Sequence, residues 1–282
     1  MIYKELLNEK NINIPLQKQA SMSIQKAFSV IAPVVVYYVV VSMVNTVFAI
    51  WFSHLVMQES QKEFVQFLVT YANQASMIVN AIAMTIGGIF LFPVFKRENS
   101  VLFVEKKYRQ HIPKIVIVGL TFAIAFNYLF GSLQEVLQSE QYEQVAQEQF
   151  SLPLWAGIII YGMISPIVEE LVFRGLVYNR LKRYFSVGIA IIFSSIIFGG
   201  YHGNAIQMGY GFVFGILMAV LYEKYDAFIV PVLLHSVANT GIYFIMNVEK
   251  IRRITMTGIS CVVCLLIATV SLVFMLKEKN KE

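Results

Sequence analysis

Three charged side chains lie close together within a long apolar stretch of the sequence. The segment "SPIVEELVFRGL" covers residues 165–176 and contains Glu169, Glu170 and Arg174. A single charge at the centre of a bilayer costs about 2.5–3.5 kcal/mol on insertion scales. On a helix, Glu170 and Arg174 share a face and can pair, whereas Glu169 is rotated away by about 100°. An unpaired carboxylate in a low-dielectric site suits a general acid or base. We therefore predict that Glu170 and Arg174 hold the helix and that Glu169 does chemistry.

Two further polar motifs follow in other apolar stretches. In "FGGYHGN", His202 lies four residues after Phe198, and in "HSVANT", His235 and Asn239 lie four residues apart on one helix face. Polar groups that face lipid without a partner are costly, so such side chains turn inward. We expect Glu169, His202, His235 and Asn239 to line one polar cavity. The alternative for the charged triplet is a positive-inside anchor whose side chains snorkel to the membrane boundary.

The composition excludes an ordinary soluble domain. The chain has 282 residues, of which 57% are hydrophobic and 14% charged, whereas soluble domains carry about 25% charged residues. A helix needs about 20 apolar residues to cross the hydrocarbon core. We predict an all-α polytopic membrane helix bundle with about eight transmembrane helices. The candidate spans are 28–52, 72–95, 113–133, 152–173, 187–202, 208–222, 227–246 and 255–276.

The positions of Lys and Arg predict the topology. Eighteen of the 22 Lys and Arg residues lie in connections on one side of the membrane, which places both termini in the cytoplasm by the positive-inside rule. The predicted organisation is a cytoplasmic tail (1–27), a single transmembrane domain (28–276) with a motif-bearing core at about 150–245, and a second cytoplasmic tail (277–282). Residues 133–150 contain four Glu and no Lys or Arg, so we expect an external amphipathic helix there.

This topology leaves one conflict of depth. Glu169 lies far along its span, counted from the outer side, while His202 lies at the outer end of the next span. The two side chains meet only if the glycine-rich spans 187–202 and 208–222 are short, tilted or broken, which membrane proteins tolerate where backbone lines a cavity.

The three motifs in this order resemble the CAAX protease and bacteriocin-processing family, the abortive-infection-type membrane endopeptidases. The match covers residues 150–245 approximately, as E-E-x-x-x-R, F-x-x-x-H and H-x-x-x-N. The resemblance implies cleavage of a membrane-associated protein or peptide, in CAAX-type or bacteriocin- or pheromone-type processing. Carried over by position, it makes Glu169 the residue that activates water, with help from His202, and makes His235 and Asn239 the groups that stabilise the oxyanion. Glu170, Arg174 and Phe198 are expected to support them.

Metal use is the main alternative within this chemistry. Glu169, His202 and His235 form a two-His, one-carboxylate set that is known to bind zinc with an open water position. The sequence has no H-E-x-x-H motif, and we favour a metal-free glutamate mechanism without a cofactor.

The expected partners are the lipid bilayer and a membrane-associated peptide or protein, with no nucleic acid. The competing function is a non-proteolytic immunity or peptide-binding protein, or a proton-linked transporter, that uses the same polar cluster. The lack of an internal inverted repeat argues against the transporter.

Overall fold

The computed structural model describes residues 24–57, 62–99 and 106–278, and no strand occurs within these ranges. The predicted tails, 1–27 and 277–282, lie largely outside the described residues. Within the described ranges, seven helices are long and apolar enough to cross a membrane, and a shorter apolar helix, α10 (Val187–Tyr201), completes the predicted set. The prediction of an all-α polytopic bundle is therefore confirmed.

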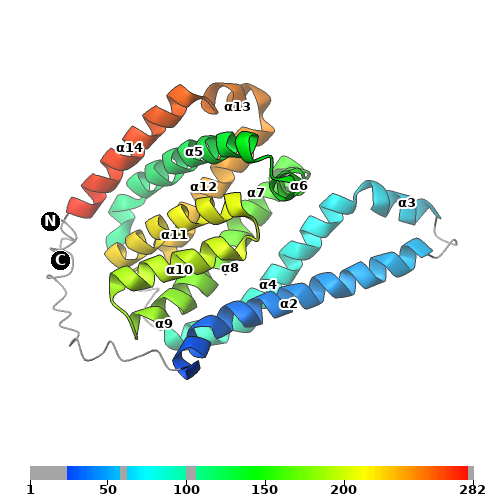
Figure 1. Ribbon diagram of the computed structural model, residues 1–282, viewed down its shortest axis with the longest axis horizontal. Coiled ribbons are helices and arrows are strands. Elements are labelled where there is room, and N and C mark those ends of the chain that lie inside the picture. The colour runs from blue at the N-terminus through cyan, green and yellow to red at the C-terminus, as the bar shows by residue number, and fades with distance from the viewer. Residues whose placement is uncertain (1–23, 58–61, 100–105, 279–282) are drawn as a thin grey trace.

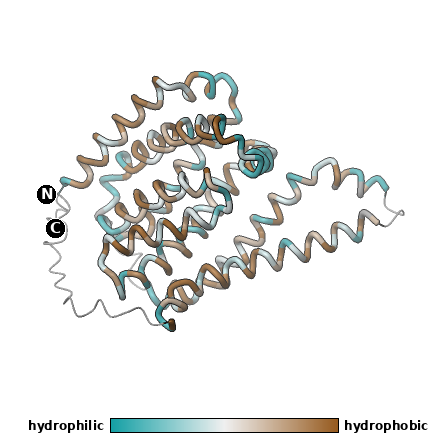
Figure 2. The backbone as a smooth tube through the Cα atoms, in the orientation of Figure 1, coloured by the Kyte–Doolittle hydropathy of each residue, from teal (hydrophilic) through white to brown (hydrophobic). Residues whose placement is uncertain are grey.

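Each predicted span corresponds to a helix. The seven longer ones are α2 (Ile24–Met57), α4 (Ala72–Glu98), α5 (Ile112–Leu137), a composite helix over Leu154–Lys182, α11 (Ala205–Tyr225), α12 (Ile229–Asn247) and α14 (Gly258–Lys277). The connections contain α3 (Lys62–Thr70), the 3₁₀ helix η3 (Lys106–His111), α6 (Glu140–Gln149) and α13 (Glu249–Thr255). Helix α6 falls within the predicted amphipathic segment and is mainly hydrophilic (Figure 2).

The helices form a bundle from which one hairpin projects (Figure 1). Helices α2 and α4 pack together near one end of the bundle and extend away from it, with α3 near the far end of the hairpin. Within the bundle, α10 pairs with α11, and α5 packs against both α12 and α14. Helix α6 lies at the end of α5, on the side that faces the projecting hairpin (Figure 1).

The composite fourth span occupies the centre of this arrangement. It runs through α7 (Leu154–Ile159), the π-helix η4 (Ile160–Ile164), α8 (Ser165–Glu170), the π-helix η5 (Leu171–Tyr178) and α9 (Asn179–Lys182). Of the residues in the most apolar 18-residue segment of this span, 67% are buried, whereas 17% are buried in the corresponding segment of α14. The charged triplet therefore lies on the span that has the most protein around it. Two π-helical segments flank α8, and such segments are rare and frequently mark functional sites.

The predicted end of this span, at residue 173, is wrong. The helix continues to Lys182 because Arg174 is fully buried and does not begin a solvated connection. Arg174 is consequently not one of the cytoplasmic charges that orient the chain. The remaining 21 Lys and Arg residues still divide seventeen to four between the two predicted sides.

Close packing of α10 against α11 depends on Gly199. A Cβ atom added there would lie 2.5 Å from the carbonyl oxygen of Met208 and 3.0 Å from the backbone nitrogen of Phe212, whereas a Cβ at the neighbouring Gly200 meets nothing within 4 Å. Because the obstructing atoms are backbone, we expect Gly199→Ala to destabilise the protein by about 1–3 kcal/mol. Gly200→Ala is the matched control and should leave stability unchanged. Thermal unfolding in detergent measures both, and equal effects would contradict this packing.

Candidate active site

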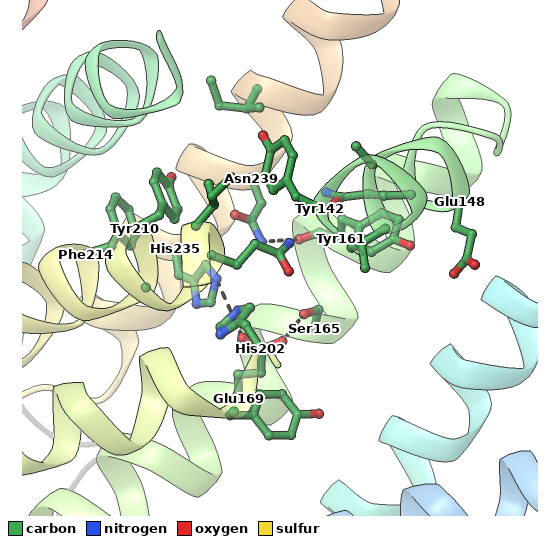
Figure 3. Close-up of a pocket in the computed structure, with 18 of the residues that line it drawn as sticks. Tyr142, Glu148, Tyr161, Ser165, Glu169, His202, Tyr210, Phe214, His235 and Asn239 are labelled. Carbon is green, nitrogen blue, oxygen red and sulfur yellow. Dashed lines mark hydrogen bonds and ion pairs between the residues drawn. The ribbon is translucent and has the colours of Figure 1, made fainter. Parts of the chain in front are cut away.

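One pocket of about 440 Å³ collects the polar residues that the sequence motifs singled out. Glu169, His202, His235 and Asn239 all line it, although they come from α8, the end of α10 and α12. Figure 3 shows these four side chains converging on the same space. The conflict of depth is resolved in favour of a shared site, because α10 is short and His202 caps its C-terminal end.

Glu169 is held in a defined orientation. Its side chain is buried, and the residue is 6% exposed. The Ser165 hydroxyl, one turn earlier on α8, donates a hydrogen bond to Oε1. The other oxygen, Oε2, lies 3.9 Å from Nε2 of His235. One carboxylate oxygen is therefore fixed by the helix, and the other faces an imidazole nitrogen.

Glu170 points away from the pocket into a buried ionic network. Its Oε2 lies 3.1 Å from Nε of Arg174 as an ion pair, and its Oε1 accepts a hydrogen bond from Nη1 at 3.2 Å. The guanidinium also donates to the carbonyl oxygen of Gly215 at 3.0 Å and lies 4.5 Å over the ring of Phe198. Glu170 and Arg174 have no exposed surface, so the snorkelling alternative is wrong for this pair.

His235 joins the network to the pocket. Its Nδ1 lies 2.9 Å from Oε1 of Glu170. A carboxylate only accepts hydrogen bonds, so Nδ1 carries the proton of this bond. This arrangement directs Nε2 of His235 toward Glu169. No local pattern predicts this contact, because 65 positions separate His235 from Glu170.

His202 is oriented by a backbone group in the same way. Its Nδ1 lies 2.9 Å from the carbonyl oxygen of Phe198, and a carbonyl also only accepts hydrogen bonds. Nδ1 therefore carries the proton, and Nε2 of the neutral ring is left as an acceptor. The two histidines are thus both fixed through Nδ1.

Asn239 contacts the distorted part of the fourth span. Its Nδ2 donates to the carbonyl oxygen of Tyr161 at 3.0 Å, inside the π-helical segment η4. The second hydrogen on Nδ2 remains for the pocket. Sequence reasoning missed both Tyr161 and Ser165 as contributors. Ser165 had a usable signal, since it lies four residues before Glu169 on the same helix face, but the carbonyl of Tyr161 had none.

The alternative zinc ligands do not form a ligand group in this structure. Both histidines have the hydrogen-bonded Nδ1 that metal-ligating imidazoles usually show. However, among the described residues no three His, Cys, Asp or Glu side chains lie close enough together to hold one ion. The residues as placed do not fit a three-ligand zinc site, so we derive no step through a metal.

Part of the chain is similar to a known protein family. Residues 151–241 match the family model described as type II CAAX prenyl endopeptidase Rce1-like. Over these residues the chain is thus similar to the CAAX protease and bacteriocin-processing family. This segment contains all of the predicted site residues of the family motifs, from Glu169 to Asn239.

Two curated relatives are similar to about half of the chain. The chain is 30% identical over 126 residues to the putative membrane peptidase YdiL of Bacillus subtilis (strain 168), which is 45% of this chain and 49% of the relative. It is 24% identical over 149 residues to the membrane-embedded CAAX protease MroQ of Staphylococcus aureus (strain USA300), which is 50% of this chain and 58% of the relative. The chain thus spans about half the length of the curated relatives it matches. No solved structure matches it significantly.

Proposed function

We propose that this chain is an intramembrane endopeptidase that uses Glu169 to activate water and needs no metal. Its substrate is a membrane-associated protein or peptide, in CAAX-type or bacteriocin- or pheromone-type processing. The observation that carries the proposal is the pairing of an oriented, buried carboxylate with three polar side chains in one pocket of about 440 Å³. The family match and the names of the two relatives support the same reaction class.

The reaction starts with a water molecule between Glu169 and His202. Oε2 of Glu169 takes one proton from this water. Nε2 of His202 accepts a hydrogen bond from the other O–H of the water and so directs the water oxygen toward the scissile carbonyl carbon. The new C–O bond forms as the C=O π electrons move to oxygen. Glu169 then gives its proton to the leaving nitrogen as the C–N bond breaks, which returns the carboxylate to its starting state.

His235 and Asn239 act on the negative oxygen of the tetrahedral intermediate. Asn239 supplies the N–H that it does not use on Tyr161. His235 donates from Nε2 while Nδ1 stays bound to Glu170, which requires the imidazolium form. That form balances the local charge, because two carboxylates, Glu169 and Glu170, lie beside His235, while the guanidinium of Arg174 pairs with Glu170 alone. Preorganised donors of this kind stabilise charge that develops in the transition state.

The function is tested with the purified full chain in vesicles and a library of membrane-anchored peptides. Cleavage is followed by mass spectrometry, and the Glu169→Gln variant shows which products depend on the site. Peptides that bind to the wild-type chain but are never cut would assign the non-proteolytic binding function instead.

Asn239→Ala should lower kcat by about 10²–10³, the usual effect of losing one oxyanion donor. KM should change little, because the cavity itself is retained. Asn247→Ala is the matched control: Asn247 lies on the same helix, and its Nδ2 donates to the carbonyl oxygen of Tyr243 at 2.9 Å, outside the pocket lining. A loss of activity that is equal in the two variants, or that follows a loss of folded protein, would remove Asn239 from the oxyanion site.

A further inference from the structure

A second cavity, of about 620 Å³, lies between the projecting hairpin and α6. Amide and hydroxyl side chains from α2 and α4 line it, together with aromatic rings and one carboxylate from α6. The polar lining residues are Asn45, Asn73, Ser76, Asn80 and Glu148. Amides on helices that can span a membrane are costly when they face lipid alone, and Asn45, Asn73 and Asn80 lie on two such helices. This concentration of amides therefore needs an explanation.

The second cavity continues the candidate active site. Met77, Asn80 and Glu148 line both cavities. Figure 3 shows Glu148 at the edge of the first pocket, beyond Tyr142 and Tyr161 as seen from the catalytic side chains. A chain that passes the catalytic residues therefore has a lined path into the second cavity.

The chemistry of this lining matches an extended peptide. Asn45 and Asn80 bond to each other through Nδ2 and Oδ1 at 3.1 Å, and each amide keeps further groups that donate or accept. Asn and Ser side chains can satisfy both the N–H and the C=O groups of a peptide backbone, which must be paired wherever water is scarce. Apolar lipid tails offer no such partners.

Glu148 gives the second cavity a single charge. No Lys, Arg or His lines the cavity, and within the described ranges Glu148 has no ion pair with a basic side chain. Its Oε1 accepts a hydrogen bond from Gln144 at 3.0 Å. The surrounding segment, 133–150, has no basic residue at all. The cavity thus presents one carboxylate that has no cationic partner within the described protein.

We propose that the second cavity binds the stretch of substrate peptide next to the bond to be cut, and that Glu148 binds a Lys or Arg side chain in that stretch. This inference rests on the proposed endopeptidase function and specifies its substrate as a basic peptide segment. Amides along the cavity hold the backbone, and the carboxylate fixes its register.

Peptide binding to the catalytically inactive Glu169→Gln variant tests this proposal directly. The full-length Glu169→Gln chain is placed in zwitterionic vesicles with lipid-anchored decapeptides of Ala, Ser and Asn, in which one Lys is scanned along the sequence. Each peptide has a counterpart with Gln in place of Lys. At one or two positions the Lys peptide should bind about tenfold more tightly than its Gln counterpart, and adding Glu148→Gln should remove this preference. Glu148→Lys should transfer the preference to the matching Glu peptide.

Glu140→Gln is the control, because Glu140 is exposed on α6 and lines neither cavity. The inference is overturned if the Lys and Gln peptides bind equally, or if Glu140→Gln removes the preference as effectively as Glu148→Gln does. Cleavage by the wild-type chain is measured in parallel. Peptide binding that depends on Glu148 without any cleavage would contradict the endopeptidase function alone, and cleavage that ignores substrate charge would contradict the Glu148 subsite alone.

Discussion

Glu169→Gln should lower kcat by at least about 10²–10⁴, the range that general-base loss produces. Gln keeps the shape of the side chain and can still accept the hydrogen bond from Ser165, but it cannot take a proton from water. Peptide binding and thermal stability should therefore survive the change. Single-turnover cleavage of a library peptide, followed by mass spectrometry, measures the chemical step separately from binding.

Glu135→Gln provides the matched control for this experiment, since Glu135 is exposed on α5 and does not line the pocket. It should retain full activity. An active Glu169→Gln protein would refute the role of Glu169 as base. If Glu170→Gln then folded normally but lost all turnover, the roles of the two neighbouring carboxylates would be exchanged.

Metal dependence is decided by a separate measurement on the same protein. Exhaustive chelation, followed by elemental analysis, should leave a zinc-free chain that still cleaves. Activity that follows one bound zinc per chain, and that returns only when zinc is added, would make Glu169, His202 and His235 ligands and would refute the glutamate mechanism.

Glu170→Gln should cost about 3–5 kcal/mol of folding stability, because it leaves the buried guanidinium of Arg174 without its counter-charge. In the wild type Oε1 of Glu170 accepts hydrogen bonds from both Arg174 and His235, and Oε2 lies in the ion pair with Nε of Arg174. A Gln amide has one acceptor oxygen and no charge, so it cannot replace both carboxylate oxygens. Lower folded yield in membranes and a lower midpoint in denaturant unfolding are the expected observations.

An exposed ion pair on α13 gives the contrast for this effect. Glu249 and Arg253 also lie four residues apart and pair, but their side chains are 63% and 76% exposed. Glu249→Gln should therefore change stability by no more than about 1 kcal/mol. Similar losses in Glu170→Gln and Glu249→Gln would show that burial of the Glu170–Arg174 pair has no energetic consequence.

Local patterns predicted much of this molecule. The eight spans followed from runs of apolar residues, and the Glu170–Arg174 contact followed from helical spacing, because both depend only on neighbours in the sequence. The convergence of Glu169, His202, His235 and Asn239 on one pocket was expected from the cost of exposing polar groups to lipid. Their catalytic roles stay predictions.

Contacts between distant spans were beyond reach of the sequence. The hydrogen bond between His235 and Glu170 depends on how α12 crosses α8. The hydrogen bond that Asn239 donates to the carbonyl oxygen of Tyr161 depends on a π-helical turn. The continuation of the fourth helix past Phe173 was missed for a related reason. A charged residue usually marks the end of a span because its side chain is solvated. The side chain of Arg174 instead contacts Glu170, Gly215 and Phe198, which lie on three different helices.

The unequal lengths of α2 and α10 have a consequence for the surrounding lipid. Helix α10 has 15 residues, which is about 22 Å at 1.5 Å per residue, while a typical hydrocarbon core is about 30 Å thick. Its outward side chains Ile192, Phe193 and Ile196 are 42–51% exposed, and we expect them to face the acyl chains. Hydrophobic mismatch of this kind is relieved by local thinning of the bilayer. At α2, with 34 residues, the mismatch has the opposite sign and favours tilt. We therefore expect a bilayer that is compressed beside α10, in which headgroups and water approach His202, at the end of that helix, more closely than they approach residues at the ends of longer helices.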